Sequence, residues 1–475
     1  MKEKKEVFDL ILYIDRSEVP DVEHLSTDVL RWCLRKAEAA AGRYARLERY
    51  YRGDHDILHR KGADQVRVSV NYAKYVVDIA LGYVLGEAVK YDPNPRSWHQ
   101  SGAPRIDLKP LLSCYDRQHI ARTDREIGRT MGVKGECMEL CYASDEADPS
   151  PRSAAIDPSC AVLVCDDSVE HHKLFALLWE RRESPGGEQY YAVTVATPYT
   201  MRRYRGGNLD TAVFQPVGEA VPHYFGAVPV IAYENNTQRQ GDFEQILSLI
   251  DAYDELMSSR LTDKRKFVDA LLVFYGMTLA PGEAERLSRE KFIDGAPLDA
   301  RAEYVQKTFD EAGVQVLADA LVEEMHKQTL TVDLSDERFS GNASGQALKL
   351  KLLAMDQMAG NKMGALEQGF KERLGLYSHW LSVKGEMAEI SPEDVDVVFT
   401  RNLPVNEAER VELVTRLQGI VDDQTLLGQL WFVKDPAEAV RNLRTQQRET
   451  AAHCREDNRD TDRAKENGPA REEEG

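Results

Sequence analysis

The chain has 475 residues, of which 42% are hydrophobic and 30% are charged. This length and composition are sufficient to bury a large core, and they exclude a wholly disordered or collagen-like chain. The 61 Lys and Arg residues against 80 Asp and Glu give a net charge of −19, which argues against a protein that grips nucleic acid over its whole surface, because phosphate neutralisation needs clustered basic residues.

The N-terminal segment predicts no targeting or membrane element. Asp9 interrupts its apolar run and no small-residue cleavage site follows, so we expect no signal peptide. The longest apolar runs fall far short of the roughly 20 residues of a membrane-spanning helix. Seven cysteines, an odd number, favour reduced thiols over a disulfide framework. We therefore expect a soluble protein made in the cytoplasm.

The first part of the chain is predicted to be helical. Over 26–52 apolar residues recur at steps of three and four, with Ser26 or Thr27 as the N-cap. A second apolar stripe covers 71–86, and a third helix is predicted over 107–131. From Glu136 onward, short β-rich runs predict a sheet. These runs are 137–142, 161–165, 174–180, 190–204 and 229–236.

The next part predicts a stalk with a tip. Asp242 is the expected N-cap of a helix over 241–266, and a second amphipathic helix is predicted over 309–330. Between them, the insert 267–308 contains short apolar runs and the turn signal Pro281-Gly282. Two helices that bracket a small β-containing insert would pack side by side.

A polar, glycine-bearing loop is predicted over 331–345, followed by one long helix from 346 to 381. Gly360, Gly364 and Gly369 lie inside this helix, and each weakens it by roughly 1 kcal/mol relative to Ala, so a kink is expected there. The remaining predictions are a strand at 395–400, helices at 407–421 and 435–447, and a disordered tail from 450.

Motifs for catalysis are weak in this sequence. Residues 128–135 lack the spacing of a phosphate-binding loop. We interpret Cys137, Cys141, Cys160 and Cys165 as structural thiols rather than metal ligands. We interpret His55 and His59 as solvated side chains, although their spacing of four would allow a shared metal on a helix. No catalytic residue, metal or cofactor is therefore expected.

Eight segments occur in an order that is familiar from one family. They are Tyr50-Tyr-Arg-Gly-Asp-His-Asp-Ile-Leu58, Val70-Asn-Tyr-Ala-Lys-Tyr-Val-Val-Asp78, Gly82-Tyr-Val-Leu-Gly86, Val228-Pro-Val-Ile-Ala-Tyr-Glu-Asn-Asn236, Gly241-Asp-Phe-Glu244, Leu249-Ile-Asp-Ala-Tyr-Asp-Glu-Leu256, Ser344-Gly-Gln-Ala-Leu-Lys349 and Phe399-Thr-Arg-Asn-Leu-Pro404. Together they resemble the portal, or head-to-tail connector, family of tailed bacteriophages, in particular the subgroup of long-tailed phages. Each segment alone is a weak signal, whereas the ordered set spans most of the chain.

The resemblance implies an α+β portal fold with a defined division of the chain. The implied parts are an N-terminal arm at 1–25, a wing at 26–240 with its return and a kinked helix at 346–404, stem helices at 241–266 and 309–330, a small α/β clip at 267–308, a tunnel loop at 331–345, a helical crown at 405–449 and a disordered acidic tail at 450–475.

The resemblance also implies a function and partners. Portal proteins form a ring, normally of twelve subunits, at one capsid vertex, and double-stranded DNA is packaged and ejected through the ring. The implied partners are further copies of the chain, double-stranded DNA, the terminase large subunit, a head-completion or tail adaptor protein, and the major capsid and scaffolding proteins. No membrane is implied. The expected location is the virion, after assembly in the host cytoplasm.

Two groups of residues are candidate parts of the DNA channel. In the tunnel loop these are Asp333, Asp336, Glu337, Arg338 and Asn342, whose acidity would keep the duplex mobile in the bore; an ordinary solvated acidic loop is the alternative. In the long helix, Gly360, Gly364 and Gly369 would form a hinge, or would simply allow close helix packing.

Two further groups are candidate contact sites. Lys264, Arg265 and Lys266 could meet DNA phosphates or the capsid rim, although cations are also favoured at a helix C-terminus. In the clip, the candidate docking residues for the motor or adaptor are Lys291, Asp294, Arg301 and Tyr304. This edge could equally contact a neighbouring subunit.

Two other functions remain open at this stage. A metal-dependent DNA phosphodiesterase could use Asp394 and Asp396 with a histidine, because alternate residues share one side of a strand. A capsid-associated adaptor without a channel is the second alternative.

Overall fold

The computed structural model describes residues 10–61, 65–94, 106–210, 213–268, 271–276, 278, 282, 301–305, 311–333, 345–401 and most positions of 412–446. The chain divides into two units, Met1–Asn402 and Leu403–Gly475. Helices and sheets are mixed within the first unit, which confirms the predicted α+β class.

The first two predicted helices are confirmed. Helix α1 (Thr27–Tyr51) is capped by Ser26, whose hydroxyl accepts a hydrogen bond from the amide of Val29, and α2 (Tyr72–Leu85) is capped by the side chain of Asn71. The prediction of a single helix over 107–131 was wrong. Two helices, α4 (Lys109–Gln118) and α5 (Ile120–Lys134), meet at His119, which has a left-handed φ of 55° and so interrupts the helix.

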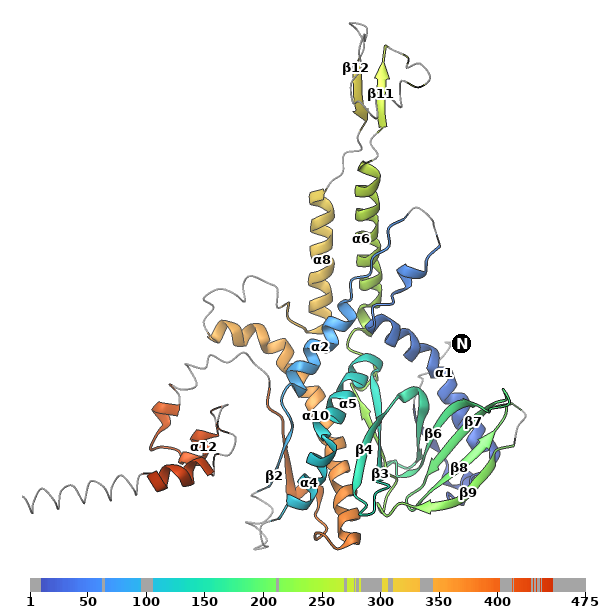
Figure 1. Cartoon of the computed structure of the whole chain (residues 1–475), viewed down its shortest axis with the longest axis vertical. Coiled ribbons are helices and arrows are strands. Elements are labelled where there is room, and N and C mark those ends of the chain that lie inside the picture. Colours follow the sequence, from blue (N-terminus) through green and yellow to red (C-terminus); the bar gives the residue numbers. More distant parts are fainter. Residues whose placement is uncertain are drawn as a thin grey trace, which may run out of the picture. The chain divides into compact units, whose positions relative to one another are not determined.

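A six-stranded sheet packs against α1 (Figure 1). Its strands, in spatial order, are β1 (Ile11–Ile14), β5 (Ala161–Asp166), β6 (Lys173–Glu183), β7 (Gln189–Ala196), β8 (Thr200–Gly206) and β9 (Gln215–Pro222). Only the β1–β5 pair is parallel within this sheet. The core between sheet and helix contains Leu30, Leu34 and Phe175, all fully buried.

The first unit also contains two smaller antiparallel sheets. One has the order β10 (Val230–Glu234), β3 (Glu136–Ala143) and β4 (Pro151–Ile156), and all its pairs are antiparallel. The other joins β2 (Lys90–Pro93) to β13 (Val395–Val398), also antiparallel. The second pairing brings together segments that are about 300 residues apart in the chain.

The stalk consists of α6 (Leu247–Val268) and α8 (Glu311–Thr329), which lie side by side (Figure 1). Arg260 of α6 donates to Gln315 of α8 at 3.0 Å and also pairs with Glu311. The strands β11 (Leu271–Tyr275) and β12 (Arg301–Val305) pair between these helices in sequence. The two helices and the β-containing insert that the sequence predicts are therefore present.

Asp242 does not cap α6, so that prediction was wrong. A 3-10 turn, Glu244–Ile246, precedes the helix, and Phe243 occupies the N-cap position of that turn. The carboxylate of Asp242 is instead bound by a side chain of the long helix α10 (Gly345–Lys384). This helix is continuous over 40 residues, and its first part runs in a different direction from the rest (Figure 1).

The second unit is described in pieces. Helix α12 (Asp423–Leu427), which the sequence did not predict, is capped by Asp422, whose carboxylate accepts from the amide of Thr425 at 3.0 Å. Helical residues at 414–417 and 438–446 fall inside the two predicted helices. Residues 450–475 lie outside the described part of the chain. Among the described helices, none combines the length and apolar character needed to cross a bilayer.

Candidate functional site

The stalk helix α6 carries a polar stripe that holds an extended segment, residues 65–70. Backbone amides of this segment donate to side chains of α6, and the pairs are Val70 to Asp254 (2.8 Å), Val68 to Ser258 (3.1 Å) and Val66 to Thr262 (3.0 Å). The acceptors are four residues apart and the donors two apart. Four helical residues rise about 6.0 Å and two extended residues about 6.7 Å, so the two spacings match and the segment runs along the helix.

His55, which lies between the end of α1 and the extended segment, binds to the same helix α6. Its Nδ1 lies 2.6 Å from Oδ2 of Asp254, its Nε2 lies 3.1 Å from the carbonyl oxygen of Tyr50, and both His55 and Asp254 side chains are fully buried. The ring therefore bridges α6 and the C-terminal end of α1. The prediction of a solvated side chain was wrong for His55 because the loop folds onto α6. His59 is exposed, as predicted, and contacts Asp54.

A second junction ties the long helix α10 to the base of the stalk. The Nζ of Lys362 lies 2.7 Å from Oδ1 of Asn235 and 2.9 Å from Oδ2 of Asp242, and only about a tenth of each of the two charged side chains is exposed. Asn235 also donates to Asp242 at 2.9 Å. Gly132 makes this approach possible, because a Cβ there would lie 2.7 Å from the Asp242 carboxylate. A polar cavity of about 210 Å³ adjoins the junction.

A buried ionic network fixes the second half of α10 in the first unit. Arg373 is fully buried and donates to Asp124 at 2.7 Å, to Glu139 at 3.1 Å and to the Tyr91 hydroxyl at 3.0 Å. These partners come from α5, β3 and β2. Burial raises the pKa of Asp124 to about 6, against the lowering effect of the guanidinium. The network thus joins four elements that are distant in sequence.

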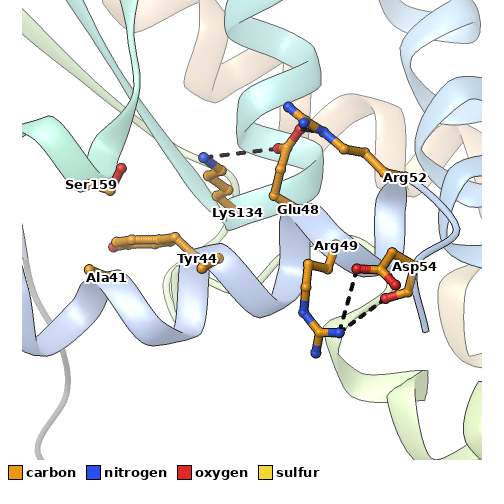
Figure 2. Close-up of a pocket in the computed structure, with 9 residues that line it drawn as sticks. Ala41, Tyr44, Glu48, Arg49, Arg52, Asp54, Lys134 and Ser159 are labelled. Atoms are coloured by element: carbon orange, nitrogen blue, oxygen red, sulfur yellow. Dashed lines mark hydrogen bonds and ion pairs between the residues drawn. The ribbon is translucent and has the colours of Figure 1, made fainter. Parts of the chain in front are cut away.

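A hollow of about 500 Å³ lies along α1 (Figure 2). Figure 2 shows Lys134 facing Glu48, with 3.9 Å between Nζ and Oε2, and Arg49 facing Asp54 at 3.7 Å. Arg52 also pairs with Glu48, at 2.9 Å. Each of these three cations already faces a carboxylate, so the positive charge in the hollow is largely compensated. The hollow is therefore a poor binding site for a phosphate group. It therefore adds nothing to the weak loop signal at 128–135.

The family of the chain follows from comparison with known sequences. Residues 30–453 match the sequence model of the family described as "Phage portal protein, SPP1 Gp6-like". The chain belongs to the phage portal protein family. It is 24% identical over 306 residues to the portal protein of Bacillus phage SPP1, and the match covers 59% of each chain. It is 23% identical over 228 residues to the portal protein of Clostridium phage phiCD119, over 46% of this chain and 48% of that one.

The sequence predicted site residues in a tunnel loop and a clip. Most of them lie outside the described residues. These are Asp336, Glu337, Arg338 and Asn342 in the loop, and Lys291 and Asp294 in the clip. Asp333, which is half-buried, is described. Arg301 is exposed in β12, where Tyr304 lies opposite Leu272, although the Tyr304 side chain is outside the description.

The basic cluster of the stalk is partly engaged within the chain. Lys264 and Arg265 are exposed, and the side chain of Lys266 is outside the description. The Nζ of Lys264 lies 3.2 Å from Oε1 of Glu311, which also pairs with Arg260. Lys264 therefore contributes to the contact between α6 and α8, and its role toward DNA or capsid remains a prediction.

The three glycines of α10 fall into two classes. A Cβ added at Gly360 or Gly364 would meet no heavy atom within 4 Å, whereas one at Gly369 would lie 2.1 Å from the ring of Tyr233. Close packing thus explains Gly369 but not Gly360 or Gly364. A hinge at the latter two positions remains a prediction.

The carboxylates of the phosphodiesterase alternative do not share a strand. Asp394 belongs to the 3-10 turn Pro392–Asp394, and β13 begins one residue later, so only Asp396 lies in the strand. In the part of the chain that the structure describes, no cluster of three or more His, Cys, Asp or Glu residues is arranged to hold a metal ion. Within the same part, Cys137, Cys141 and Cys165 are buried free thiols and Cys160 is a half-buried one.

Proposed function

We propose that the chain is a phage portal protein that assembles into a ring at one capsid vertex and forms the channel through which double-stranded DNA enters and leaves. The observation that carries this proposal is the family match over 30–453. The paired helices α6 and α8, with the β11–β12 pair between them in sequence, support it because they agree with the stem and clip implied by the family resemblance.

The acidity of the predicted tunnel loop suggests how DNA would move. In a ring, rotational symmetry repeats each channel-facing charge once per subunit. Asp333, Asp336, Glu337 and Arg338 contribute −3 + 1 = −2 per subunit. An acidic collar repels phosphates instead of binding them, and the repulsion acts only within about 8 Å at physiological salt. The duplex would therefore be centred in the channel and would slide.

The remaining roles follow from the same proposal. The segment 267–308 would dock the terminase, which supplies the energy of packaging, and later the head-completion or tail adaptor. The channel itself would carry out no catalysis. Gly360 and Gly364 would let the first part of α10 move with the loop that precedes it, since their surroundings leave room for bending.

The experiment combines imaging with packaging. Purified full-length protein should form closed rings with an open axial hole in negative-stain images, and capsids that carry it should package DNA. Asp336→Lys together with Glu337→Lys should lower the amount of DNA packaged per capsid while rings still form. Asp145→Lys with Asp167→Lys, two exposed positions in loops, is the charge-matched control. Unchanged packaging in the loop variant would remove the centring role.

A further inference from the structure

The stalk has three layers, with α6 in the middle. The stripe of α6 that holds residues 65–70 contains Asp254, Ser258 and Thr262, whereas Arg260 and Lys264 face α8. At about 100° per helical residue, the two stripes are about 140° apart around the helix axis. The extended segment and α8 therefore lie on nearly opposite sides of α6.

The edge of the stalk formed by residues 59–61 and the extended segment 65–70 carries an excess of positive charge. Over 59–70 the sequence has Arg60, Lys61 and Arg67 against one carboxylate, Asp64. Lys61 is exposed, and Arg60 is about half exposed even though it lies 3.1 Å from Glu255. The hydrogen bonds of Val66, Val68 and Val70 hold the extended segment against α6, and the ion pair with Glu255 holds Arg60 against the same helix.

The opposite edge of the stalk is acidic and apolar. On α8, Ala318 and Met325 are buried toward the chain, whereas Val316 is 69% exposed and Leu317 is 51% exposed. The carboxylates of Asp319, Glu323 and Glu324 are on exposed residues of the same helix. This face of α8 therefore presents exposed apolar side chains together with carboxylates.

We propose that the outer face of α8 binds the basic segment edge of a second copy of this chain, with Asp319 and Glu323 opposite Arg60 and Lys61. This inference rests on the proposed ring and names the surfaces that close it. A head-to-tail ring needs two different, complementary patches on opposite sides of one subunit, and the stalk has both. The opposite charges would steer the copies together, while burial of Val316 and Leu317 would stabilise the contact.

The test uses charge reversal on each edge. The first variant carries Asp319→Lys and Glu323→Lys, so both of its edges are basic. The second carries Arg60→Glu and Lys61→Glu, so both of its edges are acidic. Each variant alone should form at least tenfold fewer rings than the unchanged chain, as measured by sedimentation velocity and negative-stain imaging. Mixed in equal amounts, the two variants should form rings again, because every contact then joins an acidic edge to a basic edge.

The outcomes separate this inference from the proposed function. The inference would be overturned if each reversed variant alone formed rings as the unchanged chain does, or if mixing the two variants did not restore ring formation. Neither outcome would contradict the portal function. If the unchanged chain forms no rings under any assembly condition, the proposed function fails first. Asp145→Lys with Asp167→Lys changes the net charge by +4, as the first variant does, and as its control should assemble normally. Should a reversed variant lose its far-UV circular dichroism signal, Arg60→Gln with Lys61→Gln replaces it and should slow ring formation at low salt.

Discussion

The Nζ of Lys362 lies 2.8 Å from Oδ1 of Asp242, and this ion pair joins α10 to the turn that precedes the stalk. Removing one partner of such a buried pair leaves the other charge uncompensated, which costs roughly 3 kcal/mol or more. Lys362→Met should therefore lower the free energy of unfolding by about that amount, measured by urea denaturation followed by circular dichroism.

A matched control exists on the same helix. Lys371 pairs with Glu367 at the helix surface, where the Glu367 carboxylate is 41% exposed, so Lys371→Met should cost less than about 1 kcal/mol. Adding Asp242→Asn to Lys362→Met should recover part of the loss, because the unpaired carboxylate is then gone. Equal losses of unfolding free energy in the two lysine variants would contradict a stabilising role for the buried Lys362–Asp242 pair.

Loss of His55 should loosen the loop that lies along α6. Without the imidazole, Asp254 loses one partner and the start of the loop loses its stacking on Tyr50, with ring centroids 4.7 Å apart. His55→Ala should therefore speed trypsin cleavage after Arg60 and Lys61, because cleavage requires local opening. His59 is exposed and lies four residues after His55 in the sequence, so His59→Ala should leave the cleavage rate unchanged. Equal rates in both variants would exclude His55 as the anchor.

The glycines of α10 should respond to alanine in opposite directions. Gly364→Ala meets no neighbouring atom and should raise the free energy of unfolding by up to about 1 kcal/mol through helix propensity. Gly369→Ala would clash with the Tyr233 ring and should lower it by roughly 1–3 kcal/mol. Thermal unfolding of the two variants measures this contrast. If the hinge proposal holds, Gly360→Ala with Gly364→Ala should also reduce packaging despite the added stability.

The stability of the first unit should depend on the protonation of Glu136. This side chain accepts a hydrogen bond from the Tyr44 hydroxyl, and burial raises its pKa to about 7 from an ordinary value of 4.5. The folded state therefore holds the proton more tightly than the unfolded chain does. The stabilising contribution is complete below pH 4.5 and is lost as the pH rises through about 7, with an upper bound of roughly 3 kcal/mol.

Glu136→Gln keeps a hydrogen-bond acceptor without the charge and should remove this pH dependence. The difference in free energy of unfolding between the variant and the unchanged chain should grow in favour of the variant between pH 5 and pH 8, as measured by urea denaturation at both values. Asp124, whose pKa is about 6, titrates in both proteins and cancels in the difference. A difference that stays constant between the two pH values would contradict the assignment.

Elements with a strong local period could be predicted from the sequence. Helices α1, α2, α6 and α8 follow the spacing of their apolar residues, and the caps Ser26 and Asn71 lie where such residues are favoured. The break at His119 could not be predicted, because a left-handed φ at a residue other than glycine leaves little sequence signal. Strand β1 has only four residues and β9 is exposed along most of its length, so neither shows a clear alternation.

The contacts that organise the candidate site are long-range, which is why the sequence did not indicate them. Lys362 and Asp242 are 120 residues apart, and Arg373 and Asp124 are 249 apart. The sequence analysis also did not single out Asp254, Ser258 and Thr262 on α6, because their partners, the amides of residues 66–70, are almost 200 residues away in the chain. The proposed function rests on the family match, because the local chemistry of the chain does not indicate it.

Ring assembly is tested by negative-stain imaging of the purified full-length chain. Closed rings of identical subunits are expected, each with an axial hole wide enough for a DNA duplex. A chain that stays monomeric even within assembled virions, or a ring whose centre is filled by packed side chains, would contradict the proposed function.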